Sequence, residues 1–337
     1  MCEITYGESL KLDNPLYIDV RTPAEYCEDH IPGAVNYPIF DNEERKEIGT
    51  LYKMVSRDDA VSSGTEIGGK RIGAIIESIM SYRERDIVLY CARGGMRSGA
   101  VASLVNSLGV KAWRLKDGYR AYRSFVSGYL DSVEIRPQLF VLQGLTGAGK
   151  TEILGFIENS IDLEGMAGHR SSLFGGIGLE QQSQKSFETQ LAVRLNELGE
   201  KSYTVIEGES KKIGNLHIPE NIFRQMRNAP VIYIDTPIER RVAIIKKEYA
   251  RFNDHERVME IVLSLTKRLG QKKTDDLAGL YKSGRIDEFI EMLLVEYYDN
   301  LYRYTLDRFN YAAVIRNMES ESAAAEVLNA VAVYLKK

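Results

Sequence analysis

The sequence predicts an α/β protein with two successive parallel-sheet domains, the second of which ends in a helical part. Three observations support this fold class. The chain has 337 residues, enough for two domains that each bury a core. In both halves, short apolar runs typical of buried strands alternate with helical patterns. Each half also carries a glycine-containing loop between such a strand and a helix, at residues 91–95 and 144–149.

The composition excludes several classes of protein. Hydrophobic residues make up 44% and charged residues 27%, as in ordinary globular proteins. No apolar run approaches the length of a membrane-spanning helix and no signal peptide opens the chain, so we expect no membrane partner. The three cysteines, Cys2, Cys27 and Cys91, form neither a disulfide framework nor a CxxC pair. We therefore expect a reducing, cytoplasmic location.

The charge pattern leaves a nucleic-acid partner open. A net charge of −4 does not indicate one, because it describes only the average. Basic runs nevertheless gather in the C-terminal part, at residues 211–212, 240–241, 246–251 and 267–273. Each alone is typical of a solvated helix face, whereas together they are consistent with a phosphate-rich partner.

The N-terminal elements can be predicted in order. Residues 16–20 form a strand, and Thr22 caps the next helix with Pro23 at its first position. Residues 30–36 form a turn and a short strand. A helical pattern runs over residues 41–82, with a glycine-rich loop expected at 63–69. A further strand, a helix closed by a glycine, and a last strand at residues 112–115 complete the domain.

The loop that begins at Cys91 is the first candidate site. It joins an apolar strand, residues 87–90, to a helix, so backbone N–H groups and the helix dipole favour an anion there. These groups should lower the pKa of the thiol and make a thiolate available as a nucleophile. Arg93 and Arg97 could hold an oxyanion, and the two glycines let the loop curl. The alternative is a buried structural cysteine beside a turn.

This first part resembles the rhodanese domain over residues 5–127. The matching residues occur in the order of that family: Ile18-Asp19-Val20-Arg21 with Glu25, His30-Ile31-Pro32-Gly33-Ala34, the Cys91 loop, and Asp117-Gly118-Tyr119. Five residues separate Cys91 from Arg97, one more than in a common sulfurtransferase loop. The longer loop is better suited to a tetrahedral phosphorus group than to a bare sulfur atom. Phosphatases of this fold carry a histidine where this chain has Tyr90, which argues against protein dephosphorylation.

The second domain opens on a P-loop. We predict domains at residues 1–128 and 138–337 with a linker at 129–137, because Pro137 disfavours helix at the residue before it. An apolar strand at 138–142 leads into G-x-x-x-x-G-K-T, which precedes a helix. Such a loop cradles a diphosphate with its N–H groups, the lysine neutralises it, and the threonine can reach a bound Mg²⁺. The predicted phosphate-binding residues are Gly144, Thr146, Gly147, Ala148, Gly149, Lys150 and Thr151.

Further strands at residues 203–207 and 231–235 fit a P-loop core. Glu207 or Asp235 ends its strand near the phosphates, where each could hold a metal or water, or could simply be a strand-end acid. Arg240 follows the second of these strands, in a stretch that resembles small-molecule kinases. Residues 187–198 repeat apolar positions at helical spacing and belong to the core. After about residue 256 the chain is expected to be helical.

The loop that follows the P-loop helix carries His169, Arg170 and Ser171. A polar, glycine-rich loop at this place receives the second substrate in P-loop kinases, so these residues are substrate-site candidates. The alternative is a flexible surface loop.

As a whole, the chain resembles the tRNA 2-selenouridine synthase family. The resemblance rests on the two loops, on His169-Arg170-Ser171, and on residues 207–210 and 297–299. It implies a transferase that exchanges sulfur for selenium in the wobble 2-thiouridine of tRNA, with selenophosphate as selenium donor and geranyl diphosphate as alkyl donor. A selenophosphate-producing enzyme could be a partner. No firmly bound cofactor and no dedicated metal site are predicted, although Mg²⁺ could contact Thr151.

These residues divide the expected chemistry between two sites. The P-loop would grip the diphosphate that leaves during S-geranylation, and Cys91 would serve the selenium step, either as a selenosulfide or by activating selenophosphate held by Arg93 and Arg97. Two other functions stay open. One is an ATP-dependent P-loop kinase or ATPase fused to a sulfurtransferase or phosphatase-like domain, and the other is an RNA-binding regulator that only senses ligands.

Overall fold

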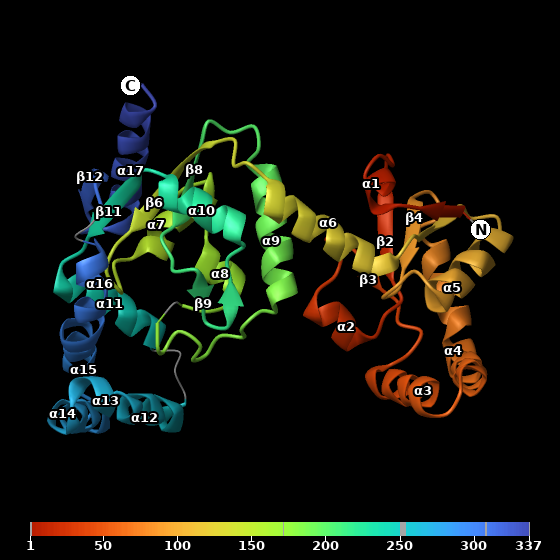
Figure 1. Ribbon diagram of the computed structural model, residues 1–337, viewed down its shortest axis with the longest axis horizontal. Coiled ribbons are helices and arrows are strands. Elements are labelled where there is room, and N and C mark those ends of the chain that lie inside the picture. Colours follow the sequence, from red (N-terminus) through yellow and green to blue (C-terminus); the bar gives the residue numbers. More distant parts are fainter. Residues whose placement is uncertain (1, 171, 250–253, 307–308, 337) are drawn as a thin grey trace. The chain divides into compact units, whose positions relative to one another are not determined.

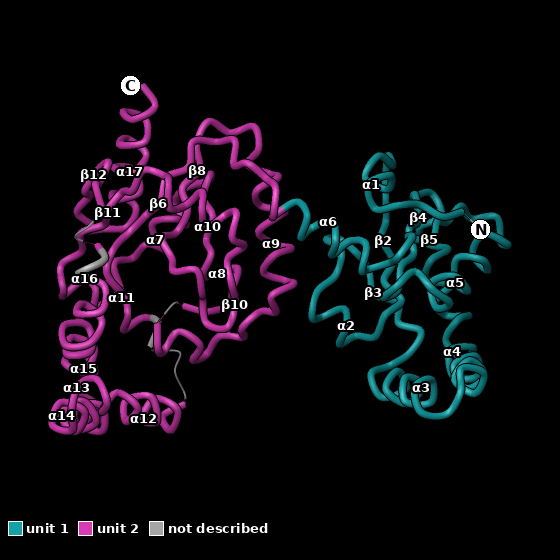
Figure 2. The backbone as a smooth tube through the Cα atoms, in the orientation of Figure 1, with its two compact units in different colours: residues 1–129 teal, residues 130–337 magenta. Residues whose placement is uncertain are grey.

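The computed structural model describes residues 2–170, 172–249, 254–306 and 309–336. The chain forms two compact units, residues 1–129 and 130–337, which have separate colours in Figure 2. Each unit is built on its own five-stranded sheet, and all strand pairs in both sheets are parallel. The predicted fold class, two successive α/β units, is therefore confirmed.

The first unit has the strand order β1-β5-β4-β2-β3 (Figure 1). Its strands are β1 (Cys2–Ile4), β2 (Pro15–Asp19), β3 (Val35–Asn36), β4 (Asp86–Tyr90) and β5 (Ala112–Leu115). Its helices are α1 (Tyr6–Ser9), α2 (Pro23–Glu28), α3 (Asn42–Met54), α4 (Arg57–Met80), α5 (Met96–Ser107) and α6 (Gly118–Ser132). Thr22 caps α2 as predicted, in a reciprocal pair with Glu25. The short edge strand β1 was not predicted.

Alternation along β2 sends side chains to both faces of this sheet. Leu16 and Ile18 join the core formed with α4 and α5. Tyr17 points to the opposite face, where its ring lies 6.0 Å from that of Tyr6 in α1. Tyr6 in turn meets Tyr122 of α6 at 5.0 Å. Both faces of the sheet are thus covered, which leaves the loops at the carboxyl ends of the strands to carry chemistry.

The glycine-rich stretch at residues 63–69 is helical, so the loop expected there is wrong. It lies inside α4, and the break in the helical region falls earlier, where Ser56 caps α4 through Asp59. Gly68 is buried in this helix. A Cβ at Gly68 would lie 2.8 Å from Ile39 Cγ2, so glycine here serves close packing and not a turn.

The junction between the units is partly helical. Helix α6 continues to Ser132, so the first part of the segment expected as linker, residues 129–137, is helix. The extended residues that follow are bound within the second unit. Asn221 donates through Nδ2 to the carbonyls of Leu130 and Val133, and Gln225 accepts from the N–H of Ile135.

The second unit has the strand order β12-β11-β6-β8-β7 (Figure 1). Its strands are β6 (Gln138–Gln143), β7 (Ser160–Ile161), β8 (Tyr203–Glu207), β11 (Val231–Asp235) and β12 (Tyr311–Arg316), with a separate antiparallel hairpin of β9 (Lys212–Ile213) and β10 (Leu216–His217). Its first helices are α7 (Lys150–Gly155), α8 (Leu163–Ala167), α9 (Gln184–Glu197), α10 (Glu220–Asn228) and α11 (Ile238–Tyr249). Its C-terminal helices are α12 (His255–Ser264), α13 (Thr266–Leu269), α14 (Gln271–Lys282), α15 (Ile286–Leu293), the π-helix η1 (Leu294–Tyr298), α16 (Asp299–Leu306) and α17 (Ser320–Tyr334).

Strand β12 contradicts the expectation that the chain is helical after residue 256. It pairs only with β11, at the edge of the sheet, and buries Ile315 while leaving Val314 63% exposed. Its Ala-Ala-Val-Ile run fits a helix as well as a strand, so the local pattern did not distinguish them. Strand β12 brings Asn317 next to the P-loop.

None of the helices in the described residues combines the length and the apolar character that a membrane-spanning segment requires.

Candidate functional site

Two loops, one in each unit, carry the candidate chemistry. The first runs from Cys91 to the start of α5, between β4 and that helix. Gly94 has φ +59°, and a Cβ there would lie 2.6 Å from the carbonyl oxygen of Leu115. Gly118 has φ +56°, and its Cβ would lie 2.1 Å from the carbonyl oxygen of Cys91. Tyr119 donates its N–H to that same carbonyl at 2.9 Å. The Asp117-Gly118-Tyr119 signature therefore shapes the cysteine loop by close backbone packing.

The thiol of Cys91 accepts hydrogen bonds from the loop. Ser98 Oγ lies 3.2 Å and Gly95 N lies 3.3 Å from Sγ. Burial raises the pKa of this thiol, but hydrogen bonds from Ser98 and the positive charge of Arg97 oppose burial, and the pKa falls below its ordinary value. Cys91 is 3% exposed, so a nucleophilic role requires a small substrate that reaches the base of the loop. The sequence analysis did not single out Ser98.

The two arginines of the loop differ in their surroundings. Arg97 is 15% exposed, and its Nη1 lies 3.3 Å from Glu25 Oε2. Burial opposes ionisation of Glu25, but the charge of Arg97, the hydrogen bonds from Thr22 and Arg97 and the charge of Arg21 together outweigh burial and lower the pKa of that carboxyl. Arg93 is exposed and makes no ion pair within the described part of the chain. An anion bound next to Cys91 would thus meet Arg97, which an ion pair holds in place, and the exposed Arg93.

A buried polar cluster lies next to the Cys91 loop. Arg21 forms a salt bridge with Asp19 at 2.7 Å, and its guanidinium lies 3.8 Å from the ring centroid of Tyr119. The Tyr119 hydroxyl donates to Asp29 Oδ2 at 2.7 Å. Every member is buried. This cluster explains structurally why the Asp19–Arg21 and Tyr119 signatures occur together.

The second loop is the P-loop, between β6 and α7. Gly147 and Gly149 have φ +76° and +80°. A Cβ at Gly147 would lie 2.8 Å from Ile245 Cδ1, and one at Gly149 would lie 2.9 Å from Asn317 Nδ2. The Ala148 carbonyl accepts hydrogen bonds from Thr236 Oγ1 and from Asn317 Nδ2, both at 2.9 Å. Neighbouring elements thus hold the glycine turn in shape.

Lys150 points toward acidic side chains. Its Nζ lies 3.9 Å from Glu209 Oε1, and both side chains are largely buried. Burial lowers the pKa of Lys150, but Glu209, Glu207 and Glu164 together outweigh burial and raise it. The ammonium is therefore protonated and available to a diphosphate.

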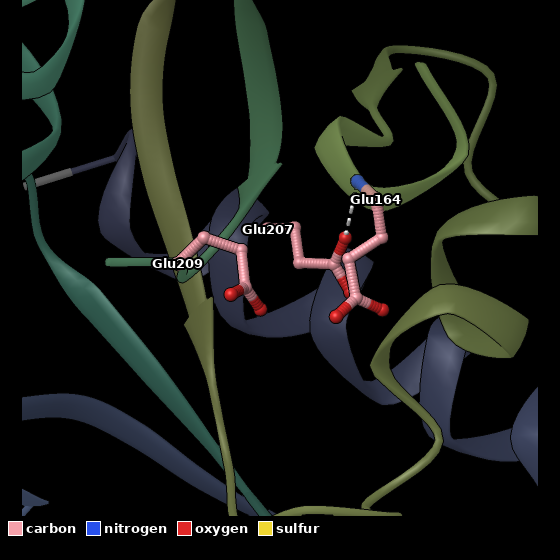
Figure 3. A group of neighbouring side chains, drawn as sticks. All are labelled: Glu164, Glu207 and Glu209. Atoms are coloured by element: carbon pink, nitrogen blue, oxygen red, sulfur yellow. Dashed lines mark hydrogen bonds between the residues drawn. The ribbon is translucent and has the colours of Figure 1, made fainter. Parts of the chain in front are cut away.

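Figure 3 shows the carboxylates of Glu164, Glu207 and Glu209 converging on one another. One oxygen from each carboxylate lies within 4.8 Å of one oxygen from each of the other two. Thr151 Oγ1 donates to Glu207 Oε1 at 3.0 Å, and the N–H of Glu164 donates to Glu207 Oε2 at 3.3 Å. Burial, followed by repulsion from Glu164 and Glu209, raises the pKa of Glu207 well above its ordinary value.

The sequence left open whether Glu207 or Asp235 lies beside the phosphate-binding loop, and the two differ in position. Glu207 reaches Thr151, whereas Asp235 is exposed at the end of β11. Glu164 and Glu209 were not predicted as site residues. Of these two, only Glu209 could have been suspected from the sequence, because it follows the candidate Glu207 by two positions. Hard oxygen donors of this kind suit a divalent cation such as Mg²⁺.

The loop after α8 is anchored, not free. Phe174 is buried, and its ring lies 6.4 Å from that of Phe289. Arg170 Nη1 lies 3.9 Å from Glu164 Oε2, which places this candidate next to the carboxylates. His169 packs instead against the turn at Gly214. Its Nδ1 is buried and has no hydrogen-bond partner among the residues that the structure describes, and burial lowers the pKa of the imidazole. Ser171 lies outside the described residues.

Arg240 and Arg241 are consecutive in α11. Arg240 was predicted as a site residue, but Arg241 is the one that contacts the P-loop. Arg240 donates to Ser320 Oγ at 2.9 Å and lies 3.8 Å from Glu152 Oε2. Arg241 is buried and donates through Nε to the carbonyl oxygen of Thr146 at 2.9 Å. No local sequence signal separates the two, because the choice depends on which side of α11 faces the loop.

Most of the basic runs are engaged in ion pairs. The pairs are Lys211–Glu220, Lys246–Asp287 and Lys273–Glu296, with Lys247 at 4.0 Å from Glu152. The side chains of these cations are 46% to 74% exposed. The runs therefore do not form a surface of positive charge alone, and a polyanion would compete with acidic partners.

Comparison with known proteins follows the two-unit division. The family model described as "tRNA 2-selenouridine synthase AAA domain" matches residues 137–332, and that of the rhodanese-like domain matches residues 7–125. The tRNA 2-selenouridine synthase of Bordetella petrii is 33% identical, with 90% of each chain covered. That of Pseudomonas syringae pv. syringae is also 33% identical, with 88% of this chain and 90% of the relative covered. A solved N-terminal domain from Clostridium difficile 630 is 44% identical and covers 37% of this chain and 98% of that one, with a TM-score of 0.36.

Proposed function

The chain belongs to the tRNA 2-selenouridine synthase family, and we propose that it converts the wobble 2-thiouridine of tRNA to 2-selenouridine through an S-geranyl-2-thiouridine intermediate. The single observation that supports this best is the pairing of two anion-binding loops in one chain. One loop presents a hydrogen-bonded thiol of lowered pKa, and the other a protonated lysine at a glycine turn. The co-substrates in this proposal are geranyl diphosphate and selenophosphate.

The first step is alkyl transfer at the P-loop. The sulfur of 2-thiouridine attacks C1 of geranyl diphosphate, a C–S bond forms, the C–O bond breaks, and diphosphate leaves with the electron pair. The N3 proton of the alkylated base is released to solvent. Lys150 and the N–H groups around Gly147 and Gly149 stabilise the charge on that leaving group. No phosphoryl group is transferred in this step, so no general base is needed to activate water.

A P-loop fold implies Mg²⁺, and the residues present fit it. Glu164, Glu207 and Glu209 offer carboxylate oxygens beside the Thr151 hydroxyl. When bound, Mg²⁺ would neutralise charge on the diphosphate. Without it, the raised pKa of Glu207 and the positive charge of Lys150 limit the repulsion within this acidic group.

The second step replaces sulfur by selenium and uses Cys91. The thiolate attacks the phosphorus of selenophosphate, the P–Se bond breaks, and selenide leaves; water then hydrolyses the phosphocysteine. Selenide attacks C2 of the S-geranyl base, and geranylthiol departs. This route needs no redox partner, whereas a selenosulfide on Cys91 would require a reductant to deliver selenide. Arg93 and Arg97 would hold the phosphate oxygens.

Nucleoside mass spectrometry tests the proposal directly. We expect tRNA containing 2-thiouridine to yield S-geranyl-2-thiouridine when geranyl diphosphate is added alone, and 2-selenouridine when selenophosphate is added as well. Unchanged 2-thiouridine under both conditions would contradict the proposed function and favour an RNA-binding regulator.

One observation favours a second candidate function, an ATPase or kinase. The carboxylates beside Thr151 would suit Mg²⁺–ATP as well as Mg²⁺–diphosphate. Steady ATP hydrolysis by the pure protein, in the absence of tRNA, would support that function. We expect none.

A further inference from the structure

We propose that Arg241, Tyr298 and Asp299 are positioning residues that fix the P-loop and the loop of residues 169–177 to one turn of helix. None of the three is assigned to either step above. The inference rests on the proposed function in one respect, that the P-loop takes a diphosphate while the 169–177 loop contacts the second substrate.

Arg241 holds the P-loop at a single carbonyl. Its Nε donates to Thr146 O at 2.9 Å, directly before Gly147 with its φ of +76°. Its Nη1 and Nη2 donate to the two carboxylate oxygens of Asp299 at 3.0 and 2.6 Å. Both side chains are nearly inaccessible, and a buried bidentate pair has a fixed geometry. The position of Asp299 therefore determines where the glycine turn lies.

Tyr298 holds the other loop. Its hydroxyl accepts a hydrogen bond from the N–H of Leu173 at 3.2 Å, and its side chain is buried. The next residue of the loop, Phe174, lies in the same apolar cluster as Tyr298. The loop is thus attached at Leu173 and Phe174, a few residues after Arg170, which faces Glu164.

Tyr298 and Asp299 are consecutive, at the junction of η1 and α16. In a regular helix, adjacent side chains point about 100° apart and rarely serve one function. The π-helical turn of residues 294–298 widens the helix at this point, and such turns often occur at functional sites. Here Tyr298 contacts the 169–177 loop directly, and Asp299 contacts the P-loop through Arg241, so movement of this turn would displace both loops together.

The first test uses Tyr298→Phe with Tyr297→Phe as its matched control. Tyr297 is the preceding, buried tyrosine, and its hydroxyl makes no hydrogen bond in the part of the chain that the structure describes. We expect trypsin to cut after Arg170 about fivefold faster in Tyr298→Phe than in wild type, because the loop loses the hydrogen bonds that the Tyr298 hydroxyl makes with Leu173 and Ser172. We also expect a KM for 2-thiouridine tRNA raised by a similar factor, with kcat less affected. Equal cleavage in the two variants would overturn the proposal.

The second test uses Asp299→Asn and the binding of inorganic diphosphate. We expect the Kd to rise about tenfold, because Arg241 loses its partner, and cleavage after Arg170 to increase although Asp299 does not touch that loop. Unchanged cleavage would overturn the link between the loops. Because Asp299→Asn leaves a buried arginine unpaired and could unfold the unit, Arg241→Lys is the second variant. It keeps a cation for Asp299 but loses the fork, so we expect weaker diphosphate binding with normal cleavage; an unchanged Kd would count against the proposal.

The outcomes separate this inference from the proposed function. Cleavage and inorganic diphosphate binding involve neither tRNA nor the geranyl group. Absence of S-geranyl and selenium products from the wild-type protein would count against the proposed function alone.

Discussion

Two opposing effects act on the Cys91 thiol, and the balance between them determines its reactivity. Burial favours the neutral thiol, whereas Ser98, the loop amides and Arg97 favour the thiolate, and together they lower the pKa. Ser98 is fully buried and follows Arg97 directly. Its hydroxyl is the one side-chain donor to Sγ among the described residues. It is therefore the residue through which the pKa can be altered most selectively.

We predict that Ser98→Ala raises the pKa of Cys91. The hydroxyl stabilises the charged form, so its loss shifts ionisation to higher pH, and the rate of alkylation at neutral pH should fall. The measurement is labelling of Cys91 with iodoacetamide as a function of pH, followed by peptide mass spectrometry. Labelling of the exposed Cys27 should be the same in both proteins and serves as the internal control. A pH profile that did not move would show that the amides alone stabilise the thiolate.

Cys91→Ser separates the two proposed steps. We expect it to abolish 2-selenouridine formation, because a serine hydroxyl is not ionised at neutral pH and cannot attack selenophosphate. S-geranyl-2-thiouridine should still form and accumulate, since the P-loop is untouched. Nucleoside mass spectrometry reads both products in one sample. Full selenation by this variant would show that our division of labour is wrong.

Lys150→Ala should have the complementary effect. Removing the cation beside the leaving diphosphate should reduce the rate of S-geranylation by about 100- to 1000-fold, as loss of one charge-stabilising donor does in other enzymes. Lys201→Ala is the matched control, because Lys201 is exposed and forms its one ion pair within the described part of the chain with the surface residue Glu158. If supplied S-geranyl tRNA is selenated normally by Lys150→Ala, the defect lies in the first step.

At the scale of single elements, features formed by neighbouring residues in the sequence could be predicted, whereas contacts between distant segments could not. The pattern of a strand, a glycine-containing loop and a helix predicted both candidate loops. In the P-loop, for example, Gly147 and Gly149 have φ above zero, a conformation that a local glycine indicates. Glu164 and Arg241 approach the P-loop from other elements, and nothing within their own segments indicates that contact. Strand β12 shows the same limit, since its partner β11 lies far away in the sequence.

Helix α4 shows why glycines misled the prediction of a loop at residues 63–69. Gly68 and Gly69 are adjacent in the helix but differ in surroundings. A Cβ at Gly68 would meet Ile39 Cγ2 at 2.8 Å and Phe40 Cε1 at 3.2 Å, whereas one at Gly69 would meet no atom within 4 Å. The sequence records a glycine at both positions, and only the packing distinguishes a required glycine from a tolerated one.

This difference gives opposite predictions for two alanine substitutions. Gly68→Ala should destabilise the first unit by about 1–3 kcal/mol, because overpacking outweighs the better helix propensity. Gly69→Ala should stabilise it by about 0.5–1 kcal/mol, because alanine loses less backbone entropy on folding. Chemical denaturation of the two variants provides the comparison. Equal effects would mean that the side chains of Ile39 and Phe40 repack freely around residue 68.

At the scale of the whole molecule, each unit has its own core and its own candidate chemistry. The core of the first unit includes Cys91 itself, and that of the second includes Ala148 of the P-loop. The polar clusters that support the two loops are likewise confined, one to residues 19–119 and the other to residues 146–299. Among the described residues, each contact given above for either loop comes from the loop's own unit.

This independence leads to our last prediction, that residues 130–337 alone catalyse the first step. The fragment keeps Leu130 and Val133, whose carbonyls accept hydrogen bonds from Asn221, so its N-terminal segment remains bound to α10. Incubated with 2-thiouridine tRNA and geranyl diphosphate, it should form S-geranyl-2-thiouridine and, with selenophosphate added, no 2-selenouridine. The full chain carrying Cys91→Ser is the matched control, because it lacks the same chemistry while keeping both units. A folded fragment that binds inorganic diphosphate but leaves the tRNA unmodified would mean that the first unit contributes to tRNA binding, and one that produces 2-selenouridine would remove Cys91 from the mechanism.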